Sequence, residues 1–268
     1  MTHNGQRLRG LVVGVCVAFV VLVAGVVTPA HAQNSPSQPS ASYQAPANPD
    51  FMLGRPRASV GIRGEWVFAS ARSDIFDFVT DQLTLEKSSF HAPGFGAEFG
   101  VNVTPRLDVV GGFDIAKSSA PSEYRKFVDN RNLPIQQTTS LRQSHFFGAV
   151  KFAVRPRGRA ISRFAWIPST IVPYVGAGGG LANYDFKQIG DFVDFSDNRV
   201  FSESFRSHGW APAAHAFGGA DIQVYKRVFV SLEGRYVWAK AKLDADFIDF
   251  EPMDLGGIRF GAGFHVMF

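Results

Sequence analysis

The sequence predicts an all-β protein, a closed antiparallel eight-stranded transmembrane β-barrel of the up-and-down type. Three observations predict it: segments of alternating apolar and polar residues, the length of these segments, and the contrast between their two faces. One face is apolar and rich in aromatic residues, and the other carries charges of both signs. In lipid, the apolar face of such a strand points outward, and closure of the barrel leaves no unpaired backbone edge.

The N-terminal residues are not expected to belong to the barrel. Two arginines precede an apolar run from residue 11 to 27, and Ala30 and Ala32 supply the small residues of a cleavage site. This is the layout of a secretory signal peptide, so we expect residues 1–32 to be removed on export. A transmembrane helix is the alternative, although the run is at the short end for spanning a bilayer.

The composition after the cleavage site predicts a linker followed by one domain. Residues 33–52 are rich in Ser, Pro, Gln and Ala, which favours a disordered periplasmic linker, and the barrel is expected over residues 53–268. Cys16, in the signal peptide, is the only cysteine, so disulfides, thiolate metal ligands and cysteine nucleophiles are excluded from the mature part. No cofactor is expected. The net charge of +4 falls by two to +2 without the arginines of the signal peptide, and export argues against a nucleic-acid partner.

Alternation is clearest in residues 257–268, where Ile258 to Phe268 at even positions are apolar and the odd positions are small or polar. The pattern recurs in six upstream segments: 60–68, 95–103, 107–115, 146–155, 214–224 and 228–238. Residues 171–186 include PYVGAGGG, whose small residues leave the facing of this eighth strand open, and a bulge would shift it. A soluble β-sandwich also alternates, but its core rarely accepts the charges found on the second face.

Connections of different length support the same topology. Short turns at 104–106 and 225–227 alternate with predicted long connections at 70–91, 117–140, 187–206 and 241–253. This is typical of barrels with short periplasmic turns and long outer loops. The link 156–170 is the exception, and its Arg157, Arg159, Arg163, Phe164 and Trp166 are expected to cover the barrel end or to lie at the interface. Two aromatic girdles are predicted, an outer one of Trp66, Phe68, Trp210, Tyr236 and Trp238 and an inner one of Tyr174, Tyr225 and Phe268.

At this point the sequence resembles a known family. The terminal GIRFGAGFHVMF looks like the C-terminal assembly signal of outer-membrane barrels, and PYVGAGGG with eight strands is similar to small OmpA/OmpX/OmpW-like barrels. The resemblance implies an outer-membrane location in a Gram-negative-type bacterium, escort by periplasmic chaperones and recognition by the barrel-assembly machinery. The residues that it assigns to the assembly signal are Phe260, Phe264, Val266 and Phe268.

The polar faces of the strands predict a charged lumen. Its expected members are Arg63, Glu65, Glu98, Asp108, Asp114, Lys151, Asp221, Glu233, Arg235 and Arg259. The bore of an eight-stranded barrel is just wide enough for its own side chains, which favours a structural salt-bridge plug over a proton or ion path.

The long connections share Asp–Phe motifs such as DFVDF and DFIDF. Packing of the rings above the barrel, or continuation of the strands beyond the bilayer, is one interpretation. A surface for a partner or for lipopolysaccharide is the other, with candidate residues Phe76, Phe78, Phe127, Phe192, Phe195, Phe247 and Phe250. The neighbouring aspartates, Asp77, Asp129, Asp194, Asp197, Asp246 and Asp249, are a weak calcium signal because their spacing fits no EF-hand loop.

No pattern indicates catalysis. Ser144–His145 and Ser207–His208 are adjacent pairs whose side chains point to opposite faces of a strand, and His91 and His215 have no evident triad partner. We therefore expect a non-enzymatic outer-membrane protein that acts in envelope structure or in surface interaction through its extracellular loops. The alternatives are a narrow channel for small or apolar solutes and a lipid A-modifying enzyme. Outer-membrane lipids, lipopolysaccharide among them, are the expected partners, and a surface partner is not identified.

Overall fold

A computed structural model describes residues 52–162 and 165–268. The predicted signal peptide, the predicted linker up to residue 51, and Arg163 and Phe164 lie outside the described residues. In the described part of the chain, no helix is long and apolar enough to span a membrane, which has no bearing on a β-barrel.

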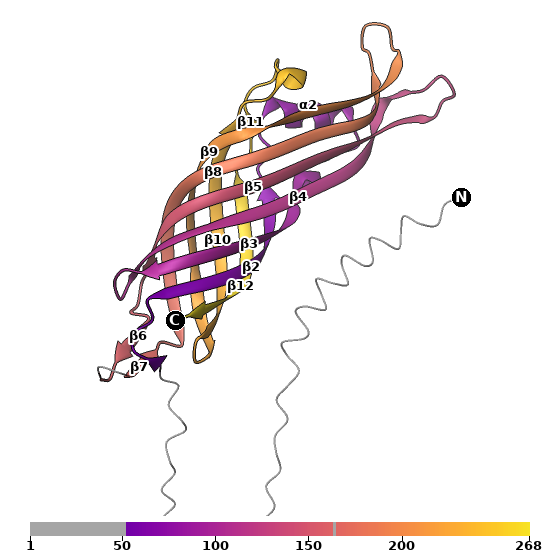
Figure 1. Ribbon diagram of the computed structural model, residues 1–268. Coiled ribbons are helices and arrows are strands. Elements are labelled where there is room, and N and C mark those ends of the chain that lie inside the picture. Colours follow the sequence, from indigo (N-terminus) through magenta and orange to yellow (C-terminus); the bar gives the residue numbers. More distant parts are fainter. Residues whose placement is uncertain (1–51, 163–164) are drawn as a thin grey trace, which may run out of the picture. The chain divides into compact units, whose positions relative to one another are not determined.

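Eight long strands form the wall of the protein (Figure 1). They are β2 (Ala58–Ala69), β3 (Ala92–Asn102), β4 (Leu107–Val128), β5 (Pro134–Ala153), β8 (Ile171–Val193), β9 (Val200–Tyr225), β10 (Val228–Ala241) and β12 (Gly257–Met267). Each pairs antiparallel with its neighbours, and β10 pairs with both β12 and β9, which closes the ring. The predicted fold, an antiparallel eight-stranded up-and-down barrel, is confirmed.

One end of the barrel, here named the terminal end, holds the short turns and the last strand's C-terminus. The β3–β4 and β9–β10 turns lie there, as does the connection between β5 and β8. That connection carries β6 (Gly158–Ala160) and β7 (Ala165–Pro168), which pair with each other, and β7 also pairs with β1 (Met52–Leu53). The link 156–170, the exception among the connections, therefore contributes two strands to a small sheet at the end of the barrel.

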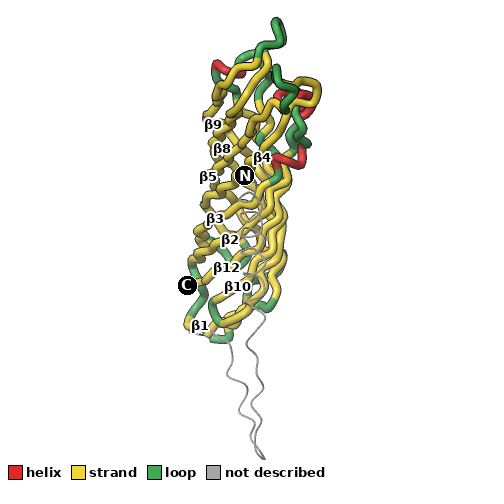
Figure 2. The backbone as a smooth tube through the Cα atoms, turned by 90° about the vertical axis from the view of Figure 1, so that its right-hand side faces the viewer, coloured by secondary structure: helices red, strands yellow, loops and turns green. Residues whose placement is uncertain are grey.

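The opposite end, here named the loop end, carries the helices (Figure 2). The β2–β3 connection contains α2 (Asp74–Gln82) and η1 (Lys87–Phe90), and the β10–β12 connection contains η2 (Ala245–Phe247) and β11 (Met253–Asp254). The prediction of long loops at 117–140 and 187–206 is wrong. Both segments are mostly strand, so that β4–β5 and β8–β9 are long hairpins that project beyond the other strands (Figure 1).

In these hairpins the strand alternation continues beyond the segments whose outward side chains are apolar. In β8, Tyr184 and Phe186 still alternate with Asp185 and Lys187, but here the apolar pair is fully buried and the polar pair faces outward. The alternation continues while its direction inverts. Such an inversion marks a change of the surrounding solvent rather than the end of a strand.

The outer wall is covered by a band of exposed apolar side chains, here named the apolar belt. It consists of Val60, Ile62, Trp66, Phe68, Phe95, Phe99, Val101, Val103, Val109, Phe146, Val150, Phe152, Ile171, Val175, Leu181, Trp210, Val224, Tyr225, Leu232, Trp238, Ile258, Phe260, Phe264, Val266 and Phe268. A segment of about 9–11 residues in each strand suffices to cross a bilayer. Soluble proteins rarely expose an apolar surface of this extent to water, so the belt is the surface of a barrel embedded in lipid.

The strand whose facing was open, β8, pairs with β9 over residues 171–193 and with β5 over residues 174–190, both without a register shift, so it contains no bulge. Its inward positions include Tyr174, Gly176 and Gly180. A Cβ on Gly176 would collide with the ring of Phe217, and one on Gly180 with the carbonyl oxygen of Phe146. The small residues that blurred the pattern are therefore needed for close approach inside the barrel.

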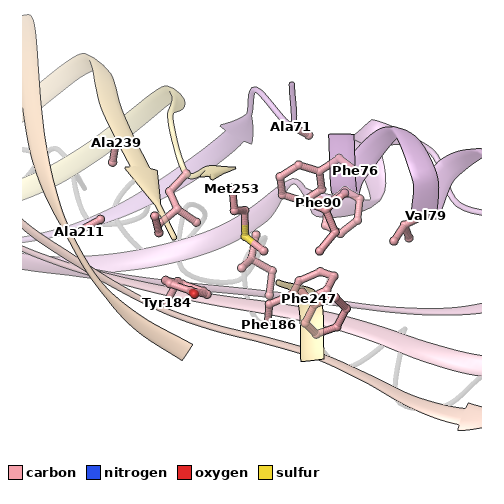
Figure 3. Packing of buried hydrophobic residues seen from close by; sticks show 14 of the residues in the cluster. Ala71, Phe76, Val79, Phe90, Tyr184, Phe186, Ala211, Ala239, Phe247 and Met253 are labelled. Atoms are coloured by element: carbon pink, nitrogen blue, oxygen red, sulfur yellow. The ribbon is translucent and has the colours of Figure 1, made fainter. Parts of the chain in front are cut away.

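At the loop end, the inside of the wall is packed with apolar side chains, here named the loop-end core (Figure 3). Its buried members are Ala71, Ile75, Phe76, Val79, Leu83, Leu85, Phe90, Leu141, Ala182, Tyr184, Phe186, Ala211, Ala239, Ala241, Phe247, Met253 and Leu255. Helix α2 supplies Ile75, Phe76 and Val79 from one face. The loop end thus has an apolar interior like that of a water-soluble domain, as the part that leaves the membrane requires, while Val128, Leu133, Ile189 and Ile248 remain exposed on its exterior.

Candidate functional site: a filled lumen and an aromatic pocket

The structure places all ten predicted lumen residues on the inner face of the wall. Eight are buried, and Glu98 and Glu233 are nearly so, with 22% and 10% of their side chains exposed. Seven of them form the central charge cluster, consisting of Arg63, Glu65, Glu98, Asp114, Glu233, Arg235 and Arg259. Asp108, Lys151 and Asp221 lie closer to the terminal end.

Asp114 is the centre of this cluster. Its two carboxylate oxygens accept hydrogen bonds from Arg63 and Arg235, the second over 3.0 Å. The same two guanidiniums extend to Glu98 and Glu233, each over 2.8 Å. Strands from four parts of the sequence therefore meet in one network of charge-assisted hydrogen bonds.

Two further pairs fill the interior toward the terminal end. Lys151 Nζ lies 2.9 Å from Asp221 Oδ2, and Asp108 pairs with Arg157, which comes from the β5–β6 connection. The sequence alone assigned no partner to Asp108, because Arg157 lies outside the strand alternation. Lys151 Nζ also lies 3.6 Å from the centre of the Tyr174 ring, a cation–π contact.

Tyr174 was predicted to belong to the inner aromatic girdle, and this is wrong. Its side chain is buried in the lumen, where the hydroxyl donates a hydrogen bond to Glu233 over 3.1 Å. Phe147 and Phe217 also face inward, with Arg235 4.4 and 5.3 Å from their ring centres. These rings share the inner face with the charges because a guanidinium stacks favourably on an aromatic face.

Little free space remains between these side chains. The cavity beside Arg63 and Glu98 measures about 10 Å³, which is about the room of one water molecule. Beyond the central charge cluster, the loop-end core occupies the inside of the wall. The geometry is that of a packed interior rather than of an open bore.

The seven predicted loop phenylalanines gather at the loop end. Phe76, Phe192 and Phe247 are buried, Phe127 and Phe250 are half-buried, and Phe78 and Phe195 are exposed. The rings of Phe78 and Phe250 lie 5.5 Å apart, and those of Phe127 and Phe195 5.7 Å. The structure therefore brings together residues from all four loop-end connections and hairpins.

Between these rings lies a pocket of about 230 Å³, here named the aromatic pocket. Its walls carry Phe78, Tyr124, Phe192, Phe195, Phe201, Phe205, Phe247 and Phe250, and Gln137, Gln188 and Asp246 supply polar groups. Burial raises the pKa of the Tyr124 hydroxyl. Tyr124, Phe201 and Phe205 were not among the predicted residues, although alternation within the extended hairpins places them near those residues.

The loop aspartates have separate structural roles. Asp129 accepts hydrogen bonds from the backbone amides of Arg131 and Leu133, and Asp77 lies 2.7 Å from Lys87. Asp246 accepts from the backbone amide of Arg206 over 3.0 Å, which caps an exposed edge of β9. Among the described residues, no three acidic, His or Cys side chains are arranged to hold a metal ion.

In neither serine–histidine pair do the two side chains contact each other, because they point to opposite faces of the strand. Ser207 is buried and shares a hydrogen bond with the Tyr184 hydroxyl, whereas His208 is exposed and lies 3.2 Å from Asp244. Ser144 and His145 follow one another along β5, and the two side chains point to opposite faces. The four residues assigned to the assembly signal lie on the apolar belt, where 40–58% of each is exposed.

Several solved structures are similar to this chain. Neisserial surface protein A is 12% identical, with a TM-score of 0.48, and the match covers 79% of this chain and 97% of that one. The outer membrane protein OprG from Pseudomonas aeruginosa is 13% identical, with a TM-score of 0.45 and coverage of 81% and 99%. Ail of Yersinia pestis is 15% identical, with a TM-score of 0.40 and coverage of 80% and 99%. No protein-family profile and no curated protein matches this chain.

Proposed function

We propose that this chain is an integral outer-membrane β-barrel of a Gram-negative-type bacterium, without enzymatic activity, that acts at the cell surface by binding an apolar ligand or partner group in its aromatic pocket. The observation that carries the proposal is the pocket itself. Most phenylalanine rings at the loop end are at least half-buried by packing. Phe78 and Phe195, however, are 43% and 53% exposed, and both line the aromatic pocket of about 230 Å³.

The orientation follows from the connections. In outer-membrane barrels, short turns face the periplasm and longer segments face outward. The loop end, with its helices and projecting hairpins, is therefore the cell-surface end. The aromatic pocket, with its mostly apolar walls, lies at this end.

Planar-bilayer recording of the purified chain is expected to show no stable conductance. The central charge cluster and the loop-end core fill the interior, and the cavity between the charges holds about one water molecule. Stable conductance steps in the wild type that change in the Arg235→Ala variant would instead favour a narrow channel, since Arg235 lies in the centre of the lumen.

Replacing Phe195 by alanine is expected to weaken binding to the aromatic pocket about fivefold or more, because one aromatic wall of the site is removed. The measurement is saturable photolabelling of the loop-end peptides by a small apolar diazirine, with an unlabelled alkylbenzene as competitor. Phe99→Ala is the matched control, since Phe99 is similarly exposed but lies on the apolar belt. Labelling that does not saturate, or an equal loss in both variants, would contradict a binding role for the pocket.

A further inference from the structure

The terminal end carries an unbalanced set of basic side chains, here named the basic collar. Its members are Arg55, Arg57, Arg106, Arg155, Arg159, Lys226 and Arg227. Lys226 is half-buried and the other six are exposed. Within the described residues, none of the seven takes part in an ion pair. The acidic side chains nearest to the basic collar in the described segments, Asp108 and Asp221, are buried and already paired with Arg157 and Lys151.

A pocket of about 230 Å³ opens within this collar. Arg55 and Arg157 line it together with Asn102, Pro56, Pro105 and Trp166. The side chain of Arg157 is 5% exposed, and its Nη2 donates to Asp108. Its Nη1 is buried and, within the described part of the chain, has no hydrogen-bond partner. A buried donor without an acceptor is costly, so the pocket favours an incoming acceptor.

The electrostatics of the pocket select an anion. Burial lowers the pKa of Arg157, Asp108 and Asp221 raise it, and the charge of Arg55 lowers it again, so the two guanidiniums are close enough to repel each other. One anionic group between them would relieve this repulsion and satisfy Nη1. Phosphate oxygens match guanidinium donors in charge and geometry.

The surroundings identify the source of that anion. Val101 and Val103 of the apolar belt flank the Asn102 that lines the pocket, and Ile161 is exposed on the same connection as Arg157. A lipid can therefore lay its acyl chains on the belt while its headgroup reaches the collar. A zwitterionic headgroup has no net charge, so the seven basic side chains favour a headgroup that is purely anionic.

We propose that the pocket between Arg55 and Arg157 binds the phosphate group of an anionic phospholipid in the inner leaflet of the membrane. The proposal rests on the membrane location given above and is independent of the aromatic pocket. The bound lipid anchors the terminal end at the leaflet boundary through one charge-assisted site rather than through the collar as a whole.

Native mass spectrometry of the full-length chain in detergent tests this, with phosphatidylglycerol and phosphatidylcholine as separate probes. Phosphatidylglycerol is expected to bind at least about tenfold more tightly, and Arg55→Gln to weaken its binding about fivefold or more. Arg227→Gln is the matched control, because Arg227 belongs to the collar but does not line the pocket, and less than about a twofold effect is expected.

The double variant Asp108→Asn/Arg157→Gln is expected to weaken binding as Arg55→Gln does, without leaving a buried charge unpaired. Heat-modifiable gel mobility checks that each variant is folded. Equal binding of both lipids, equal loss in Arg55→Gln and Arg227→Gln, or displacement of the lipid by millimolar inorganic phosphate would overturn the proposal. A chain that stays soluble without detergent would instead contradict the membrane location itself.

Discussion

Replacing Asp114 by alanine is expected to lower the free energy of unfolding by about 3–5 kcal/mol. Asp114 is 1% exposed, and its carboxylate is shared by Arg63 and Arg235. Without it, the buried guanidiniums of Arg63 and Arg235 each lose one of the carboxylates that neutralise them. Urea unfolding of the detergent-solubilised barrel, followed by tryptophan fluorescence, measures the change.

Glu203→Ala is the matched control for this charge deletion. Glu203 is exposed at the loop end and forms no ion pair among the described residues, so its removal is expected to change the unfolding free energy by less than about 0.5 kcal/mol. A loss below about 1 kcal/mol for Asp114→Ala would show that water reaches the central charge cluster and replaces the carboxylate, which contradicts a packed lumen.

Replacing Phe76 by alanine is expected to cost the loop-end core about 3–5 kcal/mol. The Phe76 side chain is fully buried, and its ring lies 4.7 Å from that of Phe90 and 6.5 Å from that of Phe186. The loss is expected to be local, because the strands of the barrel keep their own pairing. Faster hydrogen exchange and proteolysis of residues 70–91, with an unchanged barrel, are the measurements.

Phe78 on the same helix provides the comparison. It is 43% exposed and contacts Phe250 at the rim of the aromatic pocket, so Phe78→Ala is expected to leave the protection of residues 70–91 within about 1 kcal/mol of the wild type. If both variants release the segment equally, helix α2 is held by the strand ends rather than by the buried ring.

Alternation predicted the barrel because its period of two is a direct consequence of strand geometry. It placed Arg63, Asp114 and Arg235 on one side of the wall, and in the structure these three side chains meet. It failed where the solvent changes. Residues 187–193 keep the period of the strand that precedes them, but the outward side chain of Lys187 is polar and the segment was interpreted as part of a long connection.

Aromatic side chains were the second source of error. Tyr174 was assigned to the inner girdle because it lies near a strand end and aromatic residues favour the membrane interface. The structure shows it among charges, bonded to Glu233 and stacked under Lys151. A sequence pattern does not distinguish a ring that meets lipid headgroups from one that meets a buried cation, because both neighbourhoods are polar.

The basic collar could not be found from sequence because its members come from separate connections. Arg159 lies in the arginine-bearing link that was expected to cover the barrel end or to lie at the interface, whereas Arg55, Arg106 and Arg227 lie in three other segments of the chain. Their common place follows from the up-and-down topology, which returns every second connection to the same end. The unpaired nitrogen of Arg157 is a matter of packing and has no signature in the sequence.

The loop-end core draws on side chains from Ala71 to Leu255, contributed by the first strand connection, the hairpins in the middle and the last connection. It can assemble only after the earliest and latest strands have met, since neither part supplies enough apolar surface alone. We therefore expect helix α2 to pack last, after the strands of the barrel have paired. Protease resistance of residues 70–91 is therefore expected to appear during biogenesis only once the barrel has closed.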